Sequence, residues 1–352
     1  MIRIGNKIIG DKEPVFIIAE AGSNHDGKLE QAYQLIDIAA SAGADAIKFQ
    51  TFTADHIYPQ TGEEAEYLKK MGINKPVYQI IKDAEMPKHW IPLLALRCKQ
   101  KGIIFLSTPF DESAVDELLP YVSAYKIASY ELTHLPLIRH VAKKGKPIII
   151  STGASNIIEI QKAVSTIKDE GNNKIVVLQC TAKYPALLED MNLKTISTMR
   201  KELGVLTGLS DHSRDSITAP IIAIALGAVI IEKHFTISNK LSGADHKFAL
   251  EPKELEFMVQ AIRKTKEIVG SGTKICIPAE QELANYRRTI FTIKNIKAGE
   301  ELMKSNIRVL RKPGIVEHGL NPELFNELFG KKVNKDIRAY TILKQEDIEG
   351  LS

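Results

Sequence analysis

Eight runs of consecutive apolar residues recur between residues 15 and 234, and each run closes on polar or charged residues. A stretch with helical spacing follows and leads into the next run. Continuous apolar runs, unlike alternating ones, are typical of parallel strands buried on both faces. The pattern therefore predicts eight parallel strands alternating with helices, the strands lying at 15–20, 46–50, 103–108, 124–129, 147–152, 174–180, 204–210 and 228–234.

The segments between the runs are expected to form helices that cover the sheet. Leu29, Tyr33 and Ile36 fall on one helical face, and Gly43 follows where a left-handed C-terminal residue is favoured. Eight strand–helix units over about 250 residues match a TIM (β/α)8 barrel. An open doubly wound sheet is the competing fold, but it usually has a glycine-rich turn after its first strand. No GxGxxG follows the first run here.

Two stretches near the start of the chain lie outside the repeat. Residues 2–9 predict a small hairpin with its turn at Gly5-Asn6, which would plug one end of the barrel. Residues 53–90 are a polar insertion between the second and third runs. We expect this insertion to hold short helices in a long loop over the catalytic face.

The last part of the chain has a different pattern. A helix at 254–269 ends the barrel repeat, and short strand patterns begin at residue 287, with a helix predicted among them at 321–330 (NPELFNELFG). We predict a barrel domain at 1–280 and a small β-rich domain at 281–352. Because the second domain is short and polar, we expect it to bury little core and to pack against another surface.

Composition narrows the class of protein. The chain has 352 residues, 44% hydrophobic and 26% charged, with a net charge of +4, which suits a soluble globular protein and is too weak for a nucleic-acid footprint. No run approaches the ~20 apolar residues of a membrane span, and no signal peptide is evident, so we expect a cytoplasmic protein. The three cysteines are far apart and predict neither disulfides nor a zinc knuckle. Cys180 ends an apolar run, where we expect a small buried hydrophobe rather than a nucleophile.

Polar side chains gather where the predicted strands end, which is where TIM barrels place their active sites. Lys48 and Lys126 lie inside apolar runs, although a lysine is almost never fully buried without a partner. Two lysines in one cavity suit a ligand that carries phosphate and carboxylate. The alternative is a structural ion pair with Glu20 or Glu232.

Two histidines end consecutive strands, and a short loop with further polar residues follows the second. His212 and His234 would lie on neighbouring strands about 5 Å apart, with Asp245 and His246 nearby. Nitrogen ligands with an otherwise open coordination sphere suit Mn²⁺, Co²⁺, Zn²⁺ or Fe²⁺. Hydrogen-bonded core histidines are the alternative.

A family resemblance covers essentially the whole chain. The motifs IIAEAGSNHDGKLEQA, AGADAIKFQTF, FLSTPFD, YKIASYEL, STGAS, CTAKYPA, GLSDHS and EKHFT…GADH, in this order, resemble the sialic acid synthases. These enzymes condense phosphoenolpyruvate (PEP) with an N-acylated hexosamine to give a nine-carbon keto sugar acid, with cleavage of the carbon–oxygen bond of PEP. The tail from Arg287 resembles the family's antifreeze-like (SAF) domain.

The resemblance implies roles for individual residues. His212 and His234 would hold a divalent ion, Mn²⁺ first and Mg²⁺ or Co²⁺ as alternatives, that polarises the sugar aldehyde. The implied catalytic set is Glu20, Lys48, Lys126 and Asp245. PEP would be bound by Lys48, Thr108, Lys126, Ser129, Ser151 and Ser210, and the sugar by Gln50, Glu131, Tyr184, Asp245 and, from the partner chain of a domain-swapped homodimer, Arg311.

The sequence departs from the sialic acid synthases at two points. Ala182 stands where they usually have Asn, and CTAKYPA and LEDMNL look more like the branch that makes pseudaminic or legionaminic acids, or like spore-coat polysaccharide proteins. The usual Lys-Arg-Pro-Gly of the tail reads Arg311-Lys312-Pro313-Gly314. The contact with the partner chain would therefore come from Arg311 or from Lys312.

Two other functions compete with the synthase. A Schiff-base aldolase would use Lys126 or Lys48 as its nucleophile and would need no metal. A non-enzymatic sugar- or ice-binding protein would act through the tail. The second alternative leaves the converging lysines and histidines without a role.

Overall fold

The computed structural model describes residues 1–64, 74–243, 245–312, 314 and 317–351. The chain forms two compact units, Met1–Gly270 and Ser271–Ser352. The sequence placed this boundary between residues 280 and 281. The stretch after Gly270 carries no long element, and its first regular structures are short turns of helix at Pro278–Glu280 and Gln281–Ala284 (α11).

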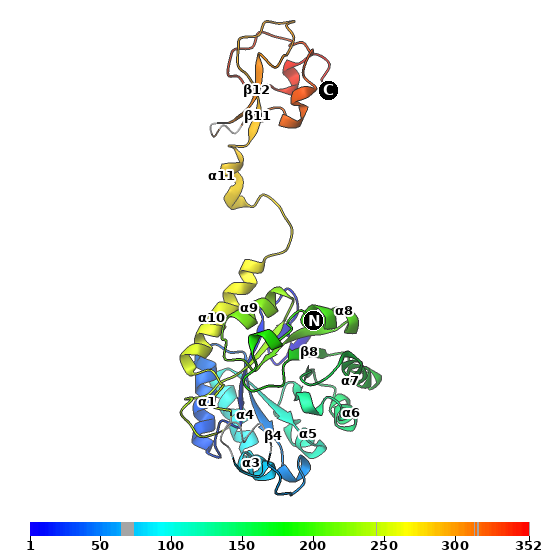
Figure 1. Cartoon of the computed structure of the whole chain (residues 1–352), viewed down its shortest axis with the longest axis vertical. Coiled ribbons are helices and arrows are strands. Elements are labelled where there is room, and N and C mark those ends of the chain that lie inside the picture. Colours follow the sequence, from blue (N-terminus) through cyan, green and yellow to red (C-terminus); the bar gives the residue numbers. More distant parts are fainter. Residues whose placement is uncertain (65–73, 244, 313, 315–316, 352) are drawn as a thin grey trace. The chain divides into compact units, whose positions relative to one another are not determined.

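The first unit is a barrel of parallel strands, which confirms the predicted fold (Figure 1). Its last strand pairs in parallel with its first, with His234 opposite Glu20, and this pairing closes the sheet. In the described part of the chain the hydrogen-bonded order is β5-β4-β3-β10-β9-β8-β7-β6, and β5 also contacts β6. The strands are β3 (Phe16–Gly22), β4 (Ala46–Thr51), β5 (Ile104–Pro109), β6 (Tyr125–Ile127), β7 (Ile148–Ser151), β8 (Ile175–Cys180), β9 (Leu206–Asp211) and β10 (Ile230–His234).

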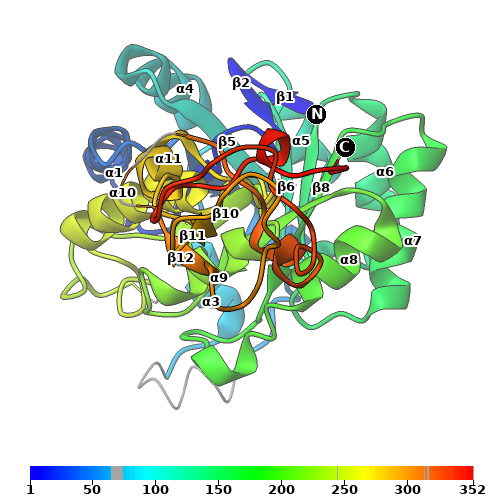
Figure 2. The same cartoon turned by 90° about the horizontal axis from the view of Figure 1, so that it is seen from above.

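Helices lie outside the strands, as the repeat predicted. Figure 2 shows α6, α7 and α8 along one side of the barrel and α1, α4 and α10 along another. Gly102 and Gly204 adopt φ of 71° and 64° at the ends of α4 and α8, a conformation that glycine reaches without strain. The helices are α1 (Leu29–Ser41), α3 (Val77–Asp83), α4 (Trp90–Lys101), α5 (Glu112–Leu118), α6 (Leu135–Lys143), α7 (Ile157–Asp169), α8 (Thr195–Leu203), α9 (Thr218–Ala225) and α10 (Pro252–Val269).

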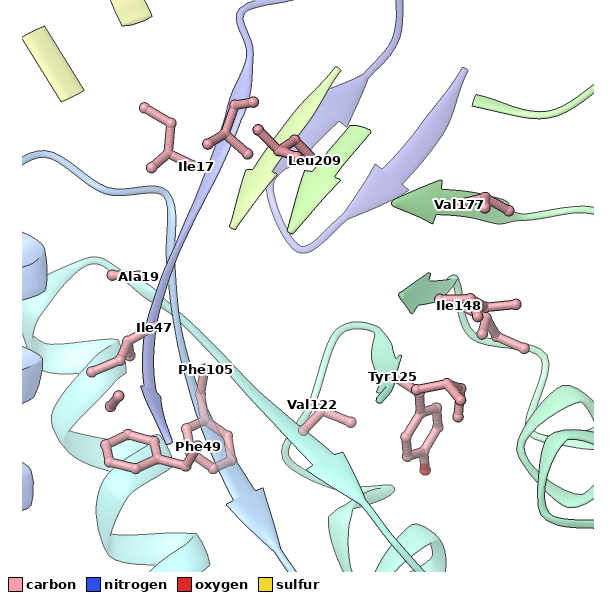
Figure 3. Packing of buried hydrophobic residues seen from close by; sticks show 14 of the residues in the cluster. Ile17, Ala19, Ile47, Phe49, Phe105, Val122, Tyr125, Ile148, Val177 and Leu209 are labelled. Carbon is pink, nitrogen blue, oxygen red and sulfur yellow. The ribbon is translucent and has the colours of Figure 1, made fainter. Parts of the chain in front are cut away.

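Each strand is buried on both of its faces, which accounts for its continuously apolar sequence. Residues such as Ile17, Ile47 and Val177 face the helices and belong to one large core (Figure 3). The alternate residues, such as Ile18 and Leu178, belong to a separate cluster inside the barrel. The barrel interior is therefore filled with apolar side chains below its carboxyl end.

The predicted hairpin is present and closes the other end of that interior. Strands β1 (Ile2–Ile4) and β2 (Lys7–Ile9) pair antiparallel, with Ile2 opposite Ile9. Ile2, Ile4 and Ile9 are buried in the same cluster as the inward-facing residues of the barrel strands. The hairpin is thus the floor of the barrel.

The insertion between β4 and α4 contains a short 3-10 helix at Ala54–His56 and the helix α3. Both agree with the expectation of short helices in this loop. Residues 65–73, which are part of the same predicted insertion, lie outside the described residues.

The second unit has its own antiparallel pair, β11 (Arg288–Thr292) and β12 (Ile307–Arg311). The expectation that it buries little core was wrong. Ten of its apolar side chains, including Ile290, Leu302 and Leu328, form a separate buried cluster. The helix predicted at 321–330 was also wrong, because only the 3-10 helix Pro322–Asn326 forms there.

None of the described helices combines the length and the apolar character that a membrane crossing needs.

Candidate active site

Four charged side chains meet at the carboxyl end of the barrel. Lys48 Nζ lies 2.7 Å from Glu20 Oε2 and 3.8 Å from Glu232 Oε1, and Lys126 Nζ lies 3.6 Å from the same Glu232 oxygen. No side chain of the four is more than 5% exposed. Glu232 therefore stands between the two lysines, and the ion pair that the sequence left open as an alternative exists within the predicted site.

Burial and neighbouring charges set the protonation of this cluster. Burial outweighs the attraction of Lys48 and raises the pKa of Glu20 to about 7. Burial opposes ionisation of Glu232 as well, but the ammonium groups of Lys126 and Lys48 hold its pKa below the ordinary value. Burial lowers the pKa of Lys126. Near neutral pH, Glu20 is thus the member of the cluster that can both hold and release a proton.

The predicted phosphate-binding hydroxyls line the same cluster. Lys48 Nζ donates to Thr108 Oγ1 at 3.1 Å, and Lys126 Nζ donates to Ser151 Oγ at 2.6 Å. Ser210 Oγ donates to Glu232 Oε1 at 3.1 Å. Ser129 Oγ accepts from the backbone of Gly153 at 3.0 Å. The structure therefore brings together lysines, hydroxyls and carboxylates from several barrel strands and the loops after them.

The two histidines also meet, with ring centroids 5.3 Å apart. His212 Nδ1 donates to the carbonyl of Thr181 at 2.9 Å, which leaves the Nε2 lone pair free. Burial lowers the pKa of His212 to about 4 and that of His234 well below its ordinary range, so both rings are neutral near pH 7. His234 Nδ1 is buried and has no hydrogen-bond partner among the described residues.

This donor set fits a divalent metal ion with few protein ligands. Neutral imidazoles are the form that binds metal, and a ring fixed through its other nitrogen is the usual arrangement. No group of three or more His, Cys, Asp or Glu side chains within the described ranges has the geometry of a metal site. His212 and His234 would thus leave most of the coordination sphere to water and substrate.

The residues expected to face the sugar lie around the histidines. The Tyr184 ring stacks on His212 with centroids 4.2 Å apart. Gln50 Nε2 donates to Glu20 Oε1 at 3.2 Å. A Cβ built on Gly22, which has φ of +53°, would lie 3.2 Å from Asp245 Oδ2 and 3.4 Å from Glu20 Oε1. Glycine at this position leaves space where these polar groups converge.

Glu131 lies at the edge of the same region, in a 3-10 turn that follows β6. Its Oε2 atom is buried without a hydrogen-bond partner among the described residues. Burial raises the pKa of Glu131 to about 7. The structure therefore places an incompletely satisfied carboxyl group beside Lys126, whose charge acts on it.

Arg311 and Lys312 lie in the second unit. Arg311 ends β12 and is exposed, whereas Lys312 is buried and its Nζ donates to the carbonyl of Glu317 at 3.2 Å. Of the two candidates for a contact with a partner chain, Arg311 is the one whose side chain is presented to solvent.

The sequence did not assign a role to Cys180 beyond a small buried hydrophobe. It is buried, as expected, but its Sγ lies 3.8 Å from both ring nitrogens of His212. The position of Cys180 at the end of β8, opposite Ser210 in the strand register, could have indicated that it belongs to the site.

A family model described as the NeuB family matches residues 35–274. The chain belongs to the NeuB family. A SAF domain matches residues 287–349, within the second unit.

Two curated relatives match nearly the whole of this NeuB-family chain. The spore coat polysaccharide biosynthesis protein SpsE of Bacillus subtilis is 44% identical, over 98% of this chain and 96% of the relative. The pseudaminic acid synthase of Campylobacter jejuni is 38% identical, over 99% of this chain and 100% of the relative. The solved N-acetylneuraminic acid synthetase of Leptospira borgpetersenii, in complex with citrate, is 38% identical with a TM-score of 0.72, over 81% of this chain and 95% of that one.

Proposed function

We propose that this protein condenses PEP with an open-chain N-acylated hexosamine to give a nonulosonic acid and phosphate. The observation that carries the proposal is a single barrel mouth in which Lys48 and Lys126 lie beside two neutral histidines. Relatives named as sialic-type synthases support the same reaction class.

PEP would occupy the lysine side of the site. Its phosphate and carboxylate suit two ammonium groups with hydroxyl donors at hydrogen-bond distance, namely Thr108 and Ser151. Because Glu20 and Glu232 already balance the lysines, the arriving anion competes with internal carboxylates. A proton taken up by Glu20 would relieve that competition.

The acceptor sugar would occupy the histidine side. A divalent ion, Mn²⁺ first and Mg²⁺ or Co²⁺ as alternatives, would be held by His212 and His234 and would act as a Lewis acid toward the aldehyde. Gln50 at the end of β4, together with Glu131, Tyr184 and Asp245 from the surrounding loops, would orient the sugar.

The reaction needs proton transfers at the aldehyde oxygen and at the water that attacks PEP. The methylene carbon of PEP forms a bond to the aldehyde carbon, and the aldehyde oxygen takes a proton to become a hydroxyl group. Water adds to the middle carbon of PEP and loses a proton, which balances the first transfer. Phosphate then leaves with the bridging oxygen, and the proton of the new hydroxyl group at that carbon passes to the leaving phosphate as the keto group forms. Glu20, with its pKa near 7, is placed to carry these protons.

The test is phosphate release from PEP with a panel of acceptors: N-acetylmannosamine and the 2,4-diacetamido-trideoxyhexoses. We expect turnover with at least one acceptor, loss of turnover after EDTA treatment, and recovery with Mn²⁺. PEP labelled with ¹⁸O in the bridging position should yield labelled phosphate. Label retained in the sugar acid, or no phosphate release with any acceptor and metal, would contradict the proposal.

A Schiff-base aldolase remains the second candidate because burial lowers the pKa of Lys126, as such a lysine requires. In the structure, however, Lys126 Nζ donates to Ser151 Oγ and to the carbonyl of Ile127. Borohydride trapping of pyruvate on the protein, together with activity that survives EDTA, would favour this candidate.

A further inference from the structure

His246 is the most completely enclosed histidine near the site, with a side chain that is 0% exposed. Its Nδ1 lies 2.6 Å from Thr236 Oγ1, and its Nε2 lies 3.0 Å and 3.2 Å from the two carboxylate oxygens of Asp26. Because an ionised carboxylate only accepts hydrogen bonds, Nε2 carries a proton and donates it to Asp26. Both ring nitrogens of His246 are therefore satisfied by protein groups.

The partners of His246 lie in two loops, one on each side of the junction between β3 and β10, which we call the barrel seam. Asp26 lies after β3, and Thr236 lies after β10, the strands whose pairing closes the sheet. Asn24 Nδ2 also crosses this seam, donating to the carbonyl of Phe235 at 2.8 Å. The bond from His246 to Asp26 therefore joins the loops after β3 and β10, beyond the point where the two strands end.

The loop is built closely around this bond. A Cβ on Gly243 would lie 2.8 Å from Asp26 Oδ1 and 2.9 Å from His246 Nε2, closer than real Cβ atoms approach. Gln31 Nε2 donates to the second Asp26 oxygen at 2.7 Å, and Asn239 Nδ2 donates to the His246 carbonyl. The backbone of His246 is thus held by Asn239 while its ring is held by Asp26.

The residue before His246 is Asp245, one of the groups predicted to act on the sugar. Asp245 Oδ2 lies 4.0 Å from His234 Nδ1, and its side chain is 30% exposed. In the described residues, no hydrogen bond from another side chain holds the Asp245 carboxylate in place. Its direction is therefore set by the backbone that carries it.

We infer that His246, through its bond to Asp26, is a positioning residue that aims the Asp245 carboxylate at the reacting sugar. This inference rests on the proposed function. Loss of the bond frees the loop after β10 to shift, and a displacement of about 1 Å at a reacting group can cost on the order of 10²-fold in rate. PEP binding is unaffected, because the lysines and hydroxyl groups proposed to bind PEP lie on, or just after, strands other than β3 and β10.

The test compares His246→Leu, His246→Gln and Asp26→Asn with wild type in steady-state kinetics. His246→Leu should lower kcat by about 10²-fold and leave the KM for PEP within about twofold. His246→Gln, whose amide can still donate to Asp26, should recover part of that loss, and Asp26→Asn should lose less than His246→Leu. Wild-type kcat in His246→Leu would overturn the inference, and if that variant does not fold, an unchanged kcat in Asp26→Asn would do so.

A double-mutant cycle separates positioning from general stability. In an Asp245→Ala background, His246→Leu should cause no further loss of kcat, because the group that it aims is already absent. A loss of equal size in both backgrounds would show that His246 does not act through Asp245.

Arg263→Gln is the matched control. Arg263 donates to the Val15 carbonyl and to Asp45 near the start of β3 and β4, so this variant cuts a partly buried contact at the opposite end of the barrel from the site. We expect it to lower the thermal midpoint without changing kcat. Hydrogen exchange should quicken in residues 23–28 and 236–250 only in the His246 and Asp26 variants.

Phosphate release and hydrogen exchange together distinguish failure of the proposed function from failure of this inference. If wild type releases no phosphate with any acceptor, the proposed function fails, whereas unchanged exchange in these loops in His246→Leu contradicts the tie itself.

Discussion

At the scale of single residues, the sequence could predict which polar residues lie at the strand ends, but not which partners those residues contact. A lysine inside an apolar run, such as Lys48 or Lys126, is conspicuous because burial of its charge needs a partner. Which carboxylate serves as that partner depends on register, and only the structure shows Glu232 between both lysines. The same holds for Cys180, whose apolar neighbours in sequence hide its contact with His212.

Glu131 gives a pH-dependent prediction. Its pKa is about 7 in the folded protein and 4.5 ordinarily, so between these values the folded state binds more protons than the unfolded state. Stability therefore falls as pH rises through this window. Glu131→Gln removes the buried charge, and we expect it to exceed wild type in free energy of unfolding by roughly 2–3 kcal/mol at pH 8 but not at pH 5.

Urea unfolding at a series of pH values checks this. The exposed Glu189→Gln is the control and should follow wild type at every pH. Parallel curves for wild type and Glu131→Gln would contradict the prediction.

At the scale of elements, all eight barrel strands were predicted close to their observed ends because a short, continuous apolar run bounded by turn residues is typical of a strand buried on both faces. The helix expected at 321–330 shows where the pattern misleads. Leu324 and Leu328 have helical spacing and are partly or fully buried, but Pro322 and Gly330 bound a stretch too short for a stable helix. The core of the second unit was missed because its apolar residues are scattered among charged ones.

The two strands that carry the histidines are also joined outside the barrel. Lys233 Nζ lies 2.7 Å from Asp211 Oδ2, with side chains 1% and 0% exposed, and it donates to the carbonyls of Ser213 and Asp215. Lys233→Met would leave Asp211 buried without its counter-charge. We expect a loss of about 3–5 kcal/mol in unfolding free energy, measured by urea titration.

The exposed pair Lys297–Asp336, with side chains 73% and 60% exposed, supplies the comparison. Lys297→Met should lower the free energy of unfolding far less than Lys233→Met, because water and salt screen an exposed pair. Adding Asp211→Asn to Lys233→Met should recover part of its loss, and a loss in Lys233→Met no greater than that in Lys297→Met would be inconsistent with a buried pair.

At the scale of the whole molecule, we propose what the resemblance to sialic acid synthases implies: two chains share their sites, with Arg311 of one chain completing the barrel of the other. Mixing tests this, because Lys126→Met removes the barrel site and Arg311→Ala removes the tail contribution. If the contact is made between chains, dissociated and reassociated mixtures should regain about a quarter of wild-type turnover, since half the dimers are mixed and hold one intact site.

Each variant alone should be nearly inactive, and the mass of the wild-type assembly in solution should be that of two chains. A mixture that stays inactive, although mixed dimers form, would place the Arg311 contact within one chain.

The hairpin at the floor of the barrel determines how ligands enter and leave the site. Ile2, Ile4 and Ile9 seal the interior from below, so reactants enter and products leave by one mouth. The groups proposed for PEP lie deep in that mouth, with Thr108, Ser151 and Ser210 no more than 2% exposed, whereas Asp245 keeps 30% of its side chain exposed. In a dead-end chamber of this kind the deeper ligand loads first, and initial-rate kinetics should show an ordered sequence with PEP leading.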